Sequence, residues 1–312
     1  MKKAILLTVF YFFVKISVAQ TILGIDVSHH QGNINWQLVA NDGKVFAFCK
    51  ATEGRTYQDP RFIANMTGGM NAGIVMGAYH FARPDNNTAI QDADNFLATA
   101  SNYIGGGFLP PVLDLEDPNS STHLDQLFTS SQLTAWVQAW LDRVENQTGV
   151  KPILYLSSHY AYYLSTSLTS YGLWIAKPGT SPTTPPNNTG NWNDWLFKQY
   201  SWNGSVNGIS GNVDLDVFHG TNSDFNALVS VQEYNNPEFS FYPNPVYNYL
   251  YIKSKSTSHP VSVKIFDLNG RLLKRLDGEI AKIDTGGLSN GIYLLQVVFD
   301  NGKRATARFV KL

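Results

Sequence analysis

Pro110-Pro111-Val112-Leu113-Asp114-Leu115-Glu116-Asp117-Pro118 is the stretch on which the fold prediction rests. Its apolar run predicts one short buried strand over Val112–Glu116, because prolines on both sides end regular structure. Side chains alternate along a strand, so Asp114 and Glu116 share a face and Asp117 points the other way. Two carboxylates in a partly desolvated site repel each other, and one takes up a proton. Solvated or ion-paired carboxylates are the alternative, but this cost favours a functional pair.

Seven more short apolar stretches, separated by polar or helical segments, are found between Leu23 and about Gly220. They are Leu23–Val27, Val45–Cys49, Ile74–Phe81, Ile153–Leu156, Leu173–Ala176, Trp195–Tyr200 and Val213–Phe218. This pattern predicts a closed α/β barrel with its active site at the C-terminal ends of the strands. Helical periodicity is clear in Ser131–Gln147, which Gly149 ends. Segments after Ile153 are short or rich in Pro, Asn and Gly, so we expect helices to be missing late in the circuit.

Composition limits the classes of function. The 312 residues include 23 Lys and Arg against 24 Asp and Glu, so no basic surplus exists for a nucleic-acid backbone. A charged fraction of 15% and an aromatic fraction of 13% suit an exported protein that handles sugars. The single cysteine, Cys49, excludes a disulfide framework, and we expect it to be a small core residue.

The N-terminus has the three parts of a secretory signal. Lys2-Lys3 is basic, Ala4 to Val14 is apolar, and Ser17-Val18-Ala19 precedes a predicted cleavage at Gln20. We therefore expect a signal peptide over residues 1–19. No other stretch approaches the roughly 20 apolar residues that a membrane span needs, so we expect no span in the mature chain.

The pattern changes from about Asn235. Short alternating stretches are separated by Asn269-Gly270, Asn290-Gly291 and Asn301-Gly302, which are turn signals between strands. This predicts a small all-β sandwich. The expected domains are a barrel over residues 20–230, a linker over 231–237 and the sandwich over 238–312.

Two further acids are expected at the same end of the barrel as Asp114 and Glu116. They are Asp26, at the end of the first strand, and Asp214, in the last. Glycoside hydrolysis needs a carboxylic acid to protonate the leaving oxygen and a carboxylate for the oxocarbenium-like centre. Neighbouring acids can raise the pKa of the proton donor toward the working pH. Polar and aromatic residues at the strand ends suit a sugar-binding surface, although singly they could be core residues: Tyr79, Tyr155, Trp174, Gln199 and Tyr200.

His29-His30 with Asp26 is an alternative metal site, since His and Asp are common zinc ligands. Adjacent histidines on an extended segment point apart, however, and no second ligand cluster supports them. We therefore expect no metal and no cofactor.

Several motifs together resemble glycoside hydrolase family 25, the Chalaropsis-type lysozymes, over about residues 22 to 221. They are Gly24-Ile25-Asp26-Val27-Ser28-His29-His30-Gln31-Gly32 with Trp36, Lys50-Ala51-Thr52-Glu53-Gly54, Gly77-Ala78-Tyr79-His80-Phe81, Pro111-Val112-Leu113-Asp114-Leu115-Glu116 and Val213-Asp214-Leu215-Asp216. The resemblance implies hydrolysis of the β-1,4 bond between N-acetylmuramic acid and N-acetylglucosamine in peptidoglycan. It also implies a flattened barrel of five β/α units followed by three plainer strands.

By the same resemblance, Glu116 is the proton donor and Asp26, Asp114 and Asp214 are supporting acids. Tyr79, Tyr155, Trp174 and Gln199 would be substrate contacts, and Lys50 and Glu53 match a motif that could be a plain ion pair. We expect the three other acids to raise the pKa of Glu116. A peptidoglycan-binding protein without turnover is the alternative, and a metal-dependent deacetylase is a third; the intact acidic set favours the enzyme.

The C-terminal segment resembles the type A sorting domain of the type IX secretion system of Bacteroidetes, over about residues 238 to 312. The matching stretches are Phe241-Tyr242-Pro243-Asn244-Pro245, Val263-Lys264-Ile265-Phe266-Asp267-Leu268-Asn269-Gly270-Arg271, Leu288-Ser289-Asn290-Gly291-Ile292-Tyr293 and the basic end from Lys303 to Leu312. This implies export through the periplasm to the cell surface or medium, with the secretion machinery as a partner. A carbohydrate-binding module is the competing interpretation, and the lack of tryptophan after Trp202 counts against it.

Overall fold

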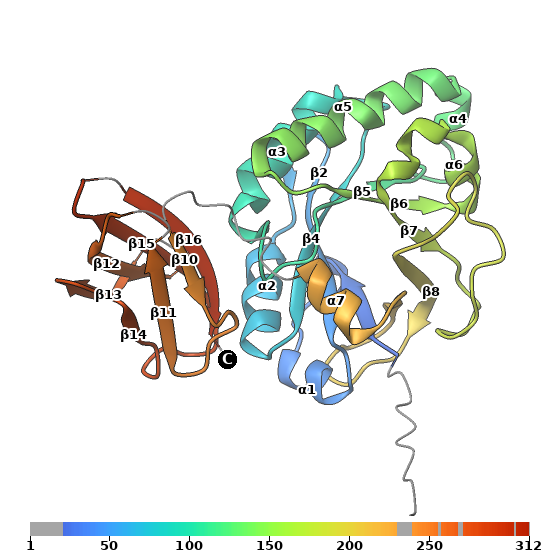
Figure 1. Cartoon of the computed structure of the whole chain (residues 1–312). Helices are drawn as coiled ribbons and strands as arrows, with labels where there is room; N and C mark the ends of the chain where they lie inside the picture. The colour runs from blue at the N-terminus through green and yellow to red at the C-terminus, as the bar shows by residue number, and fades with distance from the viewer. Residues whose placement is uncertain (1–20, 230–238, 255–256, 268–270, 303, 312) are drawn as a thin grey trace, which may run out of the picture.

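Figure 1 shows the computed structural model of the chain, which describes residues 21–229, 239–254, 257–267, 271–302 and 304–311. The expected signal peptide, the linker and the Asn269-Gly270 turn lie outside the described residues. Within the described part, no helix is both long enough and apolar enough to cross a membrane.

The first domain is a closed barrel of eight strands, as predicted. Its strands are β1 (Leu23–Val27), β2 (Phe46–Glu53), β4 (Val75–Phe81), β5 (Val112–Leu115), β6 (Ile153–Ser157), β7 (Gly172–Ala176), β8 (Phe197–Gly204) and β9 (Val213–Phe218). They follow the spatial order β1-β9-β8-β7-β6-β5-β4-β2, and pairing of β1 with β2 closes the circle. The short β3 (Tyr57–Gln58) only extends β2 as an antiparallel hairpin.

The last strand differs from the expectation that every strand presents its C-terminal end to the site. Strands β1 to β8 of the barrel run parallel, but β9 is antiparallel to both neighbours, β8 and β1. Asp214, the second residue of β9, pairs with Asp26 near the end of β1. The acid therefore reaches the predicted end of the barrel because it stands at the beginning of a reversed strand.

Helices follow the early strands, but no α-helix connects β7 to β8 or β8 to β9, which confirms the irregular barrel. They are α1 (Trp36–Asn41), α2 (Phe62–Asn71), α3 (Ala89–Ala100), α4 (Leu124–Leu127), α5 (Ser130–Thr148), α6 (Ser158–Tyr163) and α7 (Asn222–Val229), with 3₁₀ turns η1 (His29–Gln31), η2 (Ser101–Tyr103) and η3 (Thr166–Ser170). The predicted helix is α5. Thr129 and Gln132 form its capping box, and Gly149 ends it at a φ of 69°, a left-handed conformation that favours glycine.

Large side chains fill the barrel interior below the strand ends. Phe46, Phe48, Trp174 and Phe197 are buried there and contact one another, with ring centroids 4.5–6.0 Å apart. Cys49 is fully buried in the core, as expected. Because the interior is packed, open space for a ligand is left at the barrel end.

The second domain is a sandwich of two sheets, which confirms the all-β prediction. One sheet has the order β10 (Phe239–Tyr242), β11 (Tyr249–Ser254), β14 (Lys282–Asp284); the other has β13 (Leu272–Asp277), β12 (Pro260–Phe266), β15 (Gly291–Phe299), β16 (Arg304–Lys311). Leu250, Val263, Leu295 and Phe309 belong to its own buried core. The predicted Asn301-Gly302 turn joins β15 to β16.

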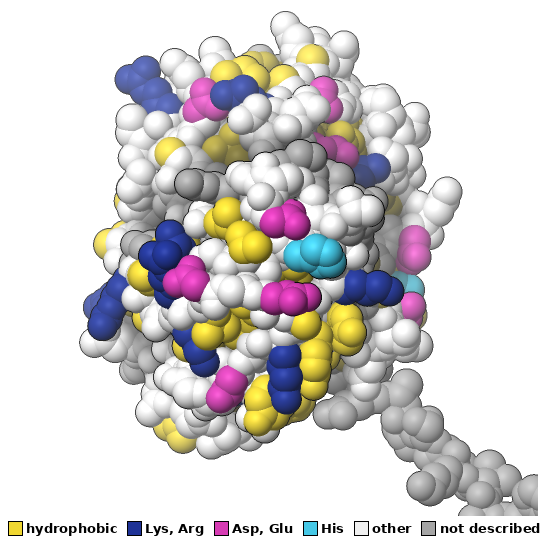
Figure 2. Space-filling model, turned by 60° about the vertical axis from the view of Figure 1, so that its left-hand side comes forward, with side chains coloured by type: hydrophobic (Ala, Val, Ile, Leu, Met, Phe, Trp, Pro, Cys, Tyr) yellow, Lys and Arg dark blue, Asp and Glu magenta, His cyan; other side chains and the backbone are white. Residues whose placement is uncertain are grey.

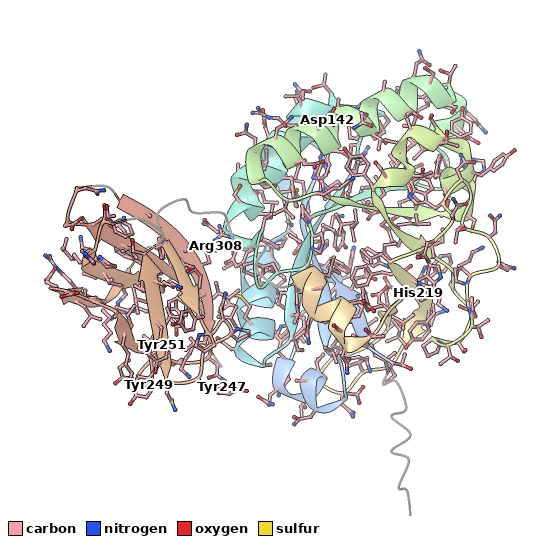
Figure 3. All side chains as sticks on the ribbon, viewed as in Figure 1. Asp142, His219, Tyr247, Tyr249, Tyr251 and Arg308 are labelled. Atoms are coloured by element: carbon pink, nitrogen blue, oxygen red, sulfur yellow. The ribbon has the colours of Figure 1, made fainter. Side chains whose placement is uncertain are left out.

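The sandwich packs against the barrel beside α2 and η2. The guanidinium of Arg308, labelled in Figure 3, donates hydrogen bonds to the backbone carbonyls of Ile104 and Ser101, the latter at 3.0 Å. Ile292 joins the barrel's core cluster. At Gly107, whose φ is 87°, a Cβ would lie 2.7 Å from Val310 Cγ2, so the barrel loop approaches the sandwich closely. No pattern in the sequence predicts this contact.

Candidate active site

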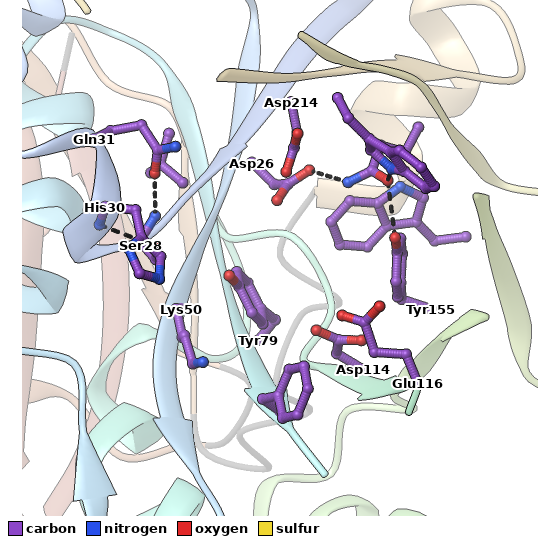
Figure 4. A pocket seen from close by; sticks show the side chains of 15 residues that line it. Asp26, Ser28, His30, Gln31, Lys50, Tyr79, Asp114, Glu116, Tyr155 and Asp214 are labelled. Carbon is purple, nitrogen blue, oxygen red and sulfur yellow. Dashed lines mark hydrogen bonds between the residues drawn. The ribbon is translucent and has the colours of Figure 1, made fainter. Parts of the chain in front are cut away.

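A cleft of about 510 Å³ opens at the strand ends of the barrel (Figure 4). Its lining includes all four predicted acids, together with Tyr79, Tyr155, Trp174 and Gln199. It also includes Val27, Ser28, His30, Gln31, Lys50, Phe81 and Trp202. The structure thus brings together eight of the nine predicted site residues. The ninth, Tyr200, is half-buried and is not among the residues that line the cleft.

Asp114 and Glu116 form what we call the β5 side of the cleft. Asp114 is 6% exposed and lies within β5, whereas Glu116 follows one residue after the strand ends. Burial raises the pKa of Glu116 to about 7; Lys50 acts in the opposite direction, and the charge of Asp117 adds to the rise. Sequence analysis attributed the raised pKa of Glu116 to Asp26, Asp114 and Asp214, but burial is its main cause. Burial and the charge of Glu116 also raise the pKa of Asp114.

Asp117 points away from the cleft, as predicted from strand alternation. It accepts hydrogen bonds from the Tyr160 hydroxyl and from the Leu124 amide at 2.9 Å, and His123 Nδ1 lies 2.8 Å from it. These three contacts fix the chain just after β5. Asp117 therefore holds the backbone from which Glu116 projects into the cleft.

Asp26, Asp214 and Asp216 form what we call the β9 side. Asp26 and Asp214 lie opposite the first pair in Figure 4. Burial, then the charge of Asp26, raises the pKa of Asp214 to about 8. Burial, then the charge of Asp216, raises that of Asp26. Asp216 is fully buried and accepts a hydrogen bond from Trp174 Nε1 at 2.9 Å. Sequence analysis placed Asp216 on this strand but did not assign it to the site. Its place beside the site is recognised only from the reversed direction of β9 and from the hydrogen bond between Asp216 and Trp174.

Gln199 connects the β9 side to the aromatic residues. Its Nε2 donates to Asp26 Oδ2 at 2.7 Å, while its Oε1 accepts from the Tyr155 hydroxyl at 2.8 Å and from Trp202 Nε1 at 2.7 Å. These partners leave one orientation for the side-chain amide. Trp202, with 54% of its surface exposed, is a cleft residue that the sequence analysis did not assign.

Lys50 lies on the cleft beside the β5 pair. Its ammonium is 2.7 Å from Glu53 Oε2 and 4.7 Å from the centre of the Phe81 ring. Glu53 in turn pairs with Arg83 at 3.0 Å. The predicted ion pair is confirmed, and Lys50 additionally brings a positive charge close to Asp114 and Glu116.

The two histidines do not point apart as expected, because the segment is a 3₁₀ turn and not extended. Their ring centroids are 4.0 Å apart. His29 Nδ1 pairs with Asp59 at 2.8 Å, whereas His30 is exposed on the cleft. In the part of the chain that the structure describes, no three His, Cys, Asp or Glu side chains are grouped so that they could hold a metal ion.

Comparison with known proteins agrees with this geometry. The family model described as glycosyl hydrolases family 25 matches residues 25–209, and the one described as a secretion system C-terminal sorting domain matches residues 240–311. Lysozyme M1 of Streptomyces globisporus is 38% identical over 219 residues, which are 67% of this chain and 71% of that protein. The N,O-diacetylmuramidase of Chalaropsis sp. is 32% identical over 208 residues, which are 62% of this chain and 96% of that protein.

Solved structures show the same barrel. A bacterial lysozyme from Streptomyces coelicolor superposes with a TM-score of 0.60 at 35% identity, covering 67% of this chain and 97% of that one. A family GH25 lysozyme from Aspergillus fumigatus gives 0.59 at 29% identity, covering 68% and 100%. The barrel, the acidic cleft and these relatives together show that the chain belongs to glycosyl hydrolases family 25 and carries a secretion system C-terminal sorting domain.

Proposed function

We propose that this protein is a secreted lysozyme that hydrolyses the β-1,4 bond between N-acetylmuramic acid and N-acetylglucosamine in peptidoglycan. Family membership and relatives named lysozyme and N,O-diacetylmuramidase support the substrate. The observation that carries the proposal is the β5 side of the cleft, where Glu116, with a pKa raised to about 7, stands next to Asp114. A carboxyl group that keeps its proton near neutral pH is what a glycosidase needs as general acid.

In the proposed mechanism, the proton of Glu116 passes to the glycosidic oxygen as that oxygen leaves the anomeric carbon. Two adjacent buried acids of this kind hold one proton between them. In the proposed mechanism Glu116 holds that proton and Asp114 is the carboxylate, which either orients the substrate's N-acetyl group to attack its own anomeric carbon or stabilises the positive charge directly. Glu116, now ionised, then takes a proton from the attacking water and is restored. Asp26 and Asp214 line the opposite side of the cleft. Because their pKa values are raised, these acids tend to keep their protons, which limits the negative charge on the β9 side.

The aromatic residues divide into a floor and a rim. Trp174 is 1% exposed and stacks on Phe48 with centroids 4.5 Å apart, so it forms a rigid floor. Tyr79 and Tyr155 are also nearly buried and line the cleft. We assign the sugar contacts to these three residues, to Gln199 and to the exposed ring of Trp202 at the rim.

Release of reducing ends from purified peptidoglycan tests the activity. We expect release by the wild type and a loss of about 10²–10⁴-fold in Glu116→Gln, which keeps the shape of the side chain but cannot donate the proton. Binding without any release by the wild type would identify the non-catalytic alternative. Unchanged activity in excess chelator would exclude the metal-dependent deacetylase.

We further propose that the sandwich directs export through the periplasm and across the outer membrane to the cell surface or medium. The match of the sorting-domain model to residues 240–311 supports this. We place the domain boundaries at residues 20–230, 231–237 and 238–312, after a signal peptide over 1–19. A chain truncated after Val231 should form an active barrel that the cell does not export. Normal appearance of this chain in the medium would contradict the export role, and insolubility would contradict the boundary.

A further inference from the structure

The three partners of Asp117 come from two other segments of the barrel and form a closed set with it. The Leu124 amide, which donates to Asp117 Oδ1, also lies 3.1 Å from the Tyr160 hydroxyl oxygen, and that hydroxyl donates to the same Oδ1. Tyr160 is 3% exposed and belongs to α6, whereas His123 and Leu124 stand at the start of α4. Asp117 therefore joins the end of β5 to two helices.

These contacts close the loop that follows β5. Leu124 is seven residues after Asp117, and inside the loop the Ser121 amide donates to Asn119 Oδ1 at 2.9 Å. The base of the loop is thus tied at Asp117, the residue directly after Glu116. Because neighbouring Cα atoms are only about 3.8 Å apart, any movement of this base is passed to the backbone of Glu116. A misplacement of about 1 Å can reduce the rate of an enzyme by about 10²-fold.

Asp117 keeps its negative charge without a permanent cation. Its partners are a hydroxyl, an amide and an imidazole, and among the residues that the structure describes no lysine or arginine pairs with it. The second domain differs, because Figure 2 shows dark blue lysine and arginine side chains beside magenta acidic ones on the face turned forward. On that domain Asp277 pairs with Arg275 at 2.8 Å. Burial would raise the pKa of Asp117, but the hydrogen bonds of its partners, that of Tyr160 foremost, outweigh burial and lower the pKa.

The other charged and titratable groups around Glu116 line the cleft itself. They are Lys50 on β2, Asp114 on β5, Asp26 on β1, Asp214 on β9, Tyr79 on β4 and Tyr155 on β6. A substrate in the cleft replaces water around these groups. Asp117 is not among the lining residues and acts on Glu116 through the protein, so bound substrate does not touch it.

We propose that Asp117 is a positioning residue for Glu116. Its fixed carboxylate holds the backbone of the proton donor in place, and its negative charge opposes loss of the proton that the donor must deliver. The proposal rests on the proposed function, in which Glu116 is the general acid. Burial raises the pKa of Glu116 to about 7 against the opposing charge of Lys50, and the charge of Asp117 adds to the rise. Because the Asp117 side chain is 31% exposed, solvent screens this charge and keeps its effect below that of burial.

The pH dependence of kcat/KM on a soluble oligosaccharide of peptidoglycan tests the charge of Asp117. The protein is the full chain from Gln20. Asp117→Asn keeps the size of the side chain and an oxygen for the Leu124 amide, but it removes the charge. We expect the basic limb of the profile to move to lower pH by about half a unit. KM should not change, because Asp117 lies outside the cleft lining.

Tyr160→Phe tests the placement separately and protects the experiment against misfolding of the first variant. It keeps the buried ring and the charge of Asp117 but removes one donor to that carboxylate. We expect kcat to fall by about tenfold, while KM and the position of the basic limb stay the same.

Asp125→Asn is a matched control for both variants. Asp125 lies on α4, and its Oδ2 is 2.9 Å from His159 Nε2, close to the 2.8 Å between Asp117 and His123. It is not among the residues that line the cleft. The control should change neither the pH profile nor kcat.

Three results would overturn the proposal. A folded Asp117→Asn protein whose basic limb stays in place would remove the effect of the charge, and an unchanged kcat in Tyr160→Phe would remove the positioning role. A raised KM with unchanged kcat in either variant would show that this loop contacts the substrate instead. Failure of the proposed function is recognised separately, because the wild type would then not cleave the oligosaccharide at all.

Discussion

The two sides of the cleft hold their carboxyl groups in different ways. On the β9 side, protein groups donate to the acids: Gln199 to Asp26 and Trp174 to Asp216. On the β5 side, no described side chain donates to Asp114, whose nearby counter-charge is Lys50. One buried oxygen on each side, Asp114 Oδ1 and Asp216 Oδ2, has no hydrogen-bond partner in the described part of the chain. Buried carboxylates with open acceptor positions are costly in a folded protein. The comparison indicates that hydrogen bonds from the protein hold the acids of the β9 side in place, whereas the acids of the β5 side are available to the substrate.

The largest effect should follow from removing charge on the β5 side. We expect Asp114→Asn to lower kcat/KM by 10²-fold or more, because the developing positive charge loses its carboxylate. The charge of Glu116 raises the pKa of Asp114, and repulsion between two charges is mutual, so without Asp114 the pKa of Glu116 should fall and the basic limb of the pH profile should move to lower pH. Initial rates on a soluble oligosaccharide between pH 4 and 9 measure both changes. A normal rate with an unmoved profile would disprove the coupling of the two acids.

A smaller effect should follow from loosening the β9 side. Gln199→Met removes the donor to Asp26 and the acceptor for Tyr155 and Trp202, and we expect kcat/KM to fall by about tenfold. Because the bond from Gln199 lowers the pKa of Asp26, that acid should hold its proton more firmly in the variant. Steady-state kinetics give the loss. A fall as large as that of Asp114→Asn would mean that the β9 side takes part in the chemistry directly.

The acids of the β9 side should also make stability depend on pH. The pKa of Asp214 is about 8 in the folded chain and about 4 in an unfolded one, so ionisation costs stability as pH rises between these values. The wild type should therefore lose stability from pH 5 to pH 8. Asp214→Asn should reduce this loss by at most about 4 kcal/mol, the equivalent of three pKa units, and by less because solvent screens this partly exposed carboxyl group. Urea unfolding at both values measures it, with the exposed Asp194→Asn as control; equal slopes would exclude a proton on Asp214.

The smallest effect concerns the counter-charge. Lys50 lowers the pKa values of Asp114 and Glu116, so Lys50→Met should raise both and move the pH profile upward, by about half a unit to one unit. This is opposite in sign to Asp114→Asn. Lys50→Arg should restore the profile. Lys151→Met is a matched control, because Lys151 lies over Tyr171 at 4.7 Å, the distance of Lys50 from Phe81. A profile that stays in place would show that Lys50 does not act on the pair.

The sequence predicted the strands of the barrel well but not their directions. Val213–Phe218 was predicted residue for residue, since its apolar pattern is the same in either direction along the chain. Periodicity contains no information on direction, which depends on the length and path of the preceding loop. The grouping of Asp26 and Asp214 with Asp114 and Glu116 could nevertheless be predicted, because Asp26 and Asp214 each lie near an end of a strand.

Local irregularity explains the cleft residue that sequence analysis missed. Simple alternation along β8 predicts that residues two apart share a face, but the pairing shifts between Gln199 and Ser201 and again before Gly204. These shifts bring Trp202 to Gln199. Tyr200 lies outside the lining, as alternation from its neighbour Gln199 already requires. A β-bulge depends on tertiary packing, so strand periodicity cannot predict it. The contact of Arg308 with the barrel was equally invisible, because its acceptors are backbone carbonyls.

The reversed direction of β9 has a consequence for when the enzyme becomes active. β9 inserts between β1 and β8, and it brings Asp214 opposite Asp26 from the far end of the barrel sequence. Such long-range pairing closes a large loop and forms late in folding. A nascent or incompletely folded chain therefore lacks one complete side of its cleft. The topology therefore makes the completed cleft depend on β9, the last strand of the barrel along the chain.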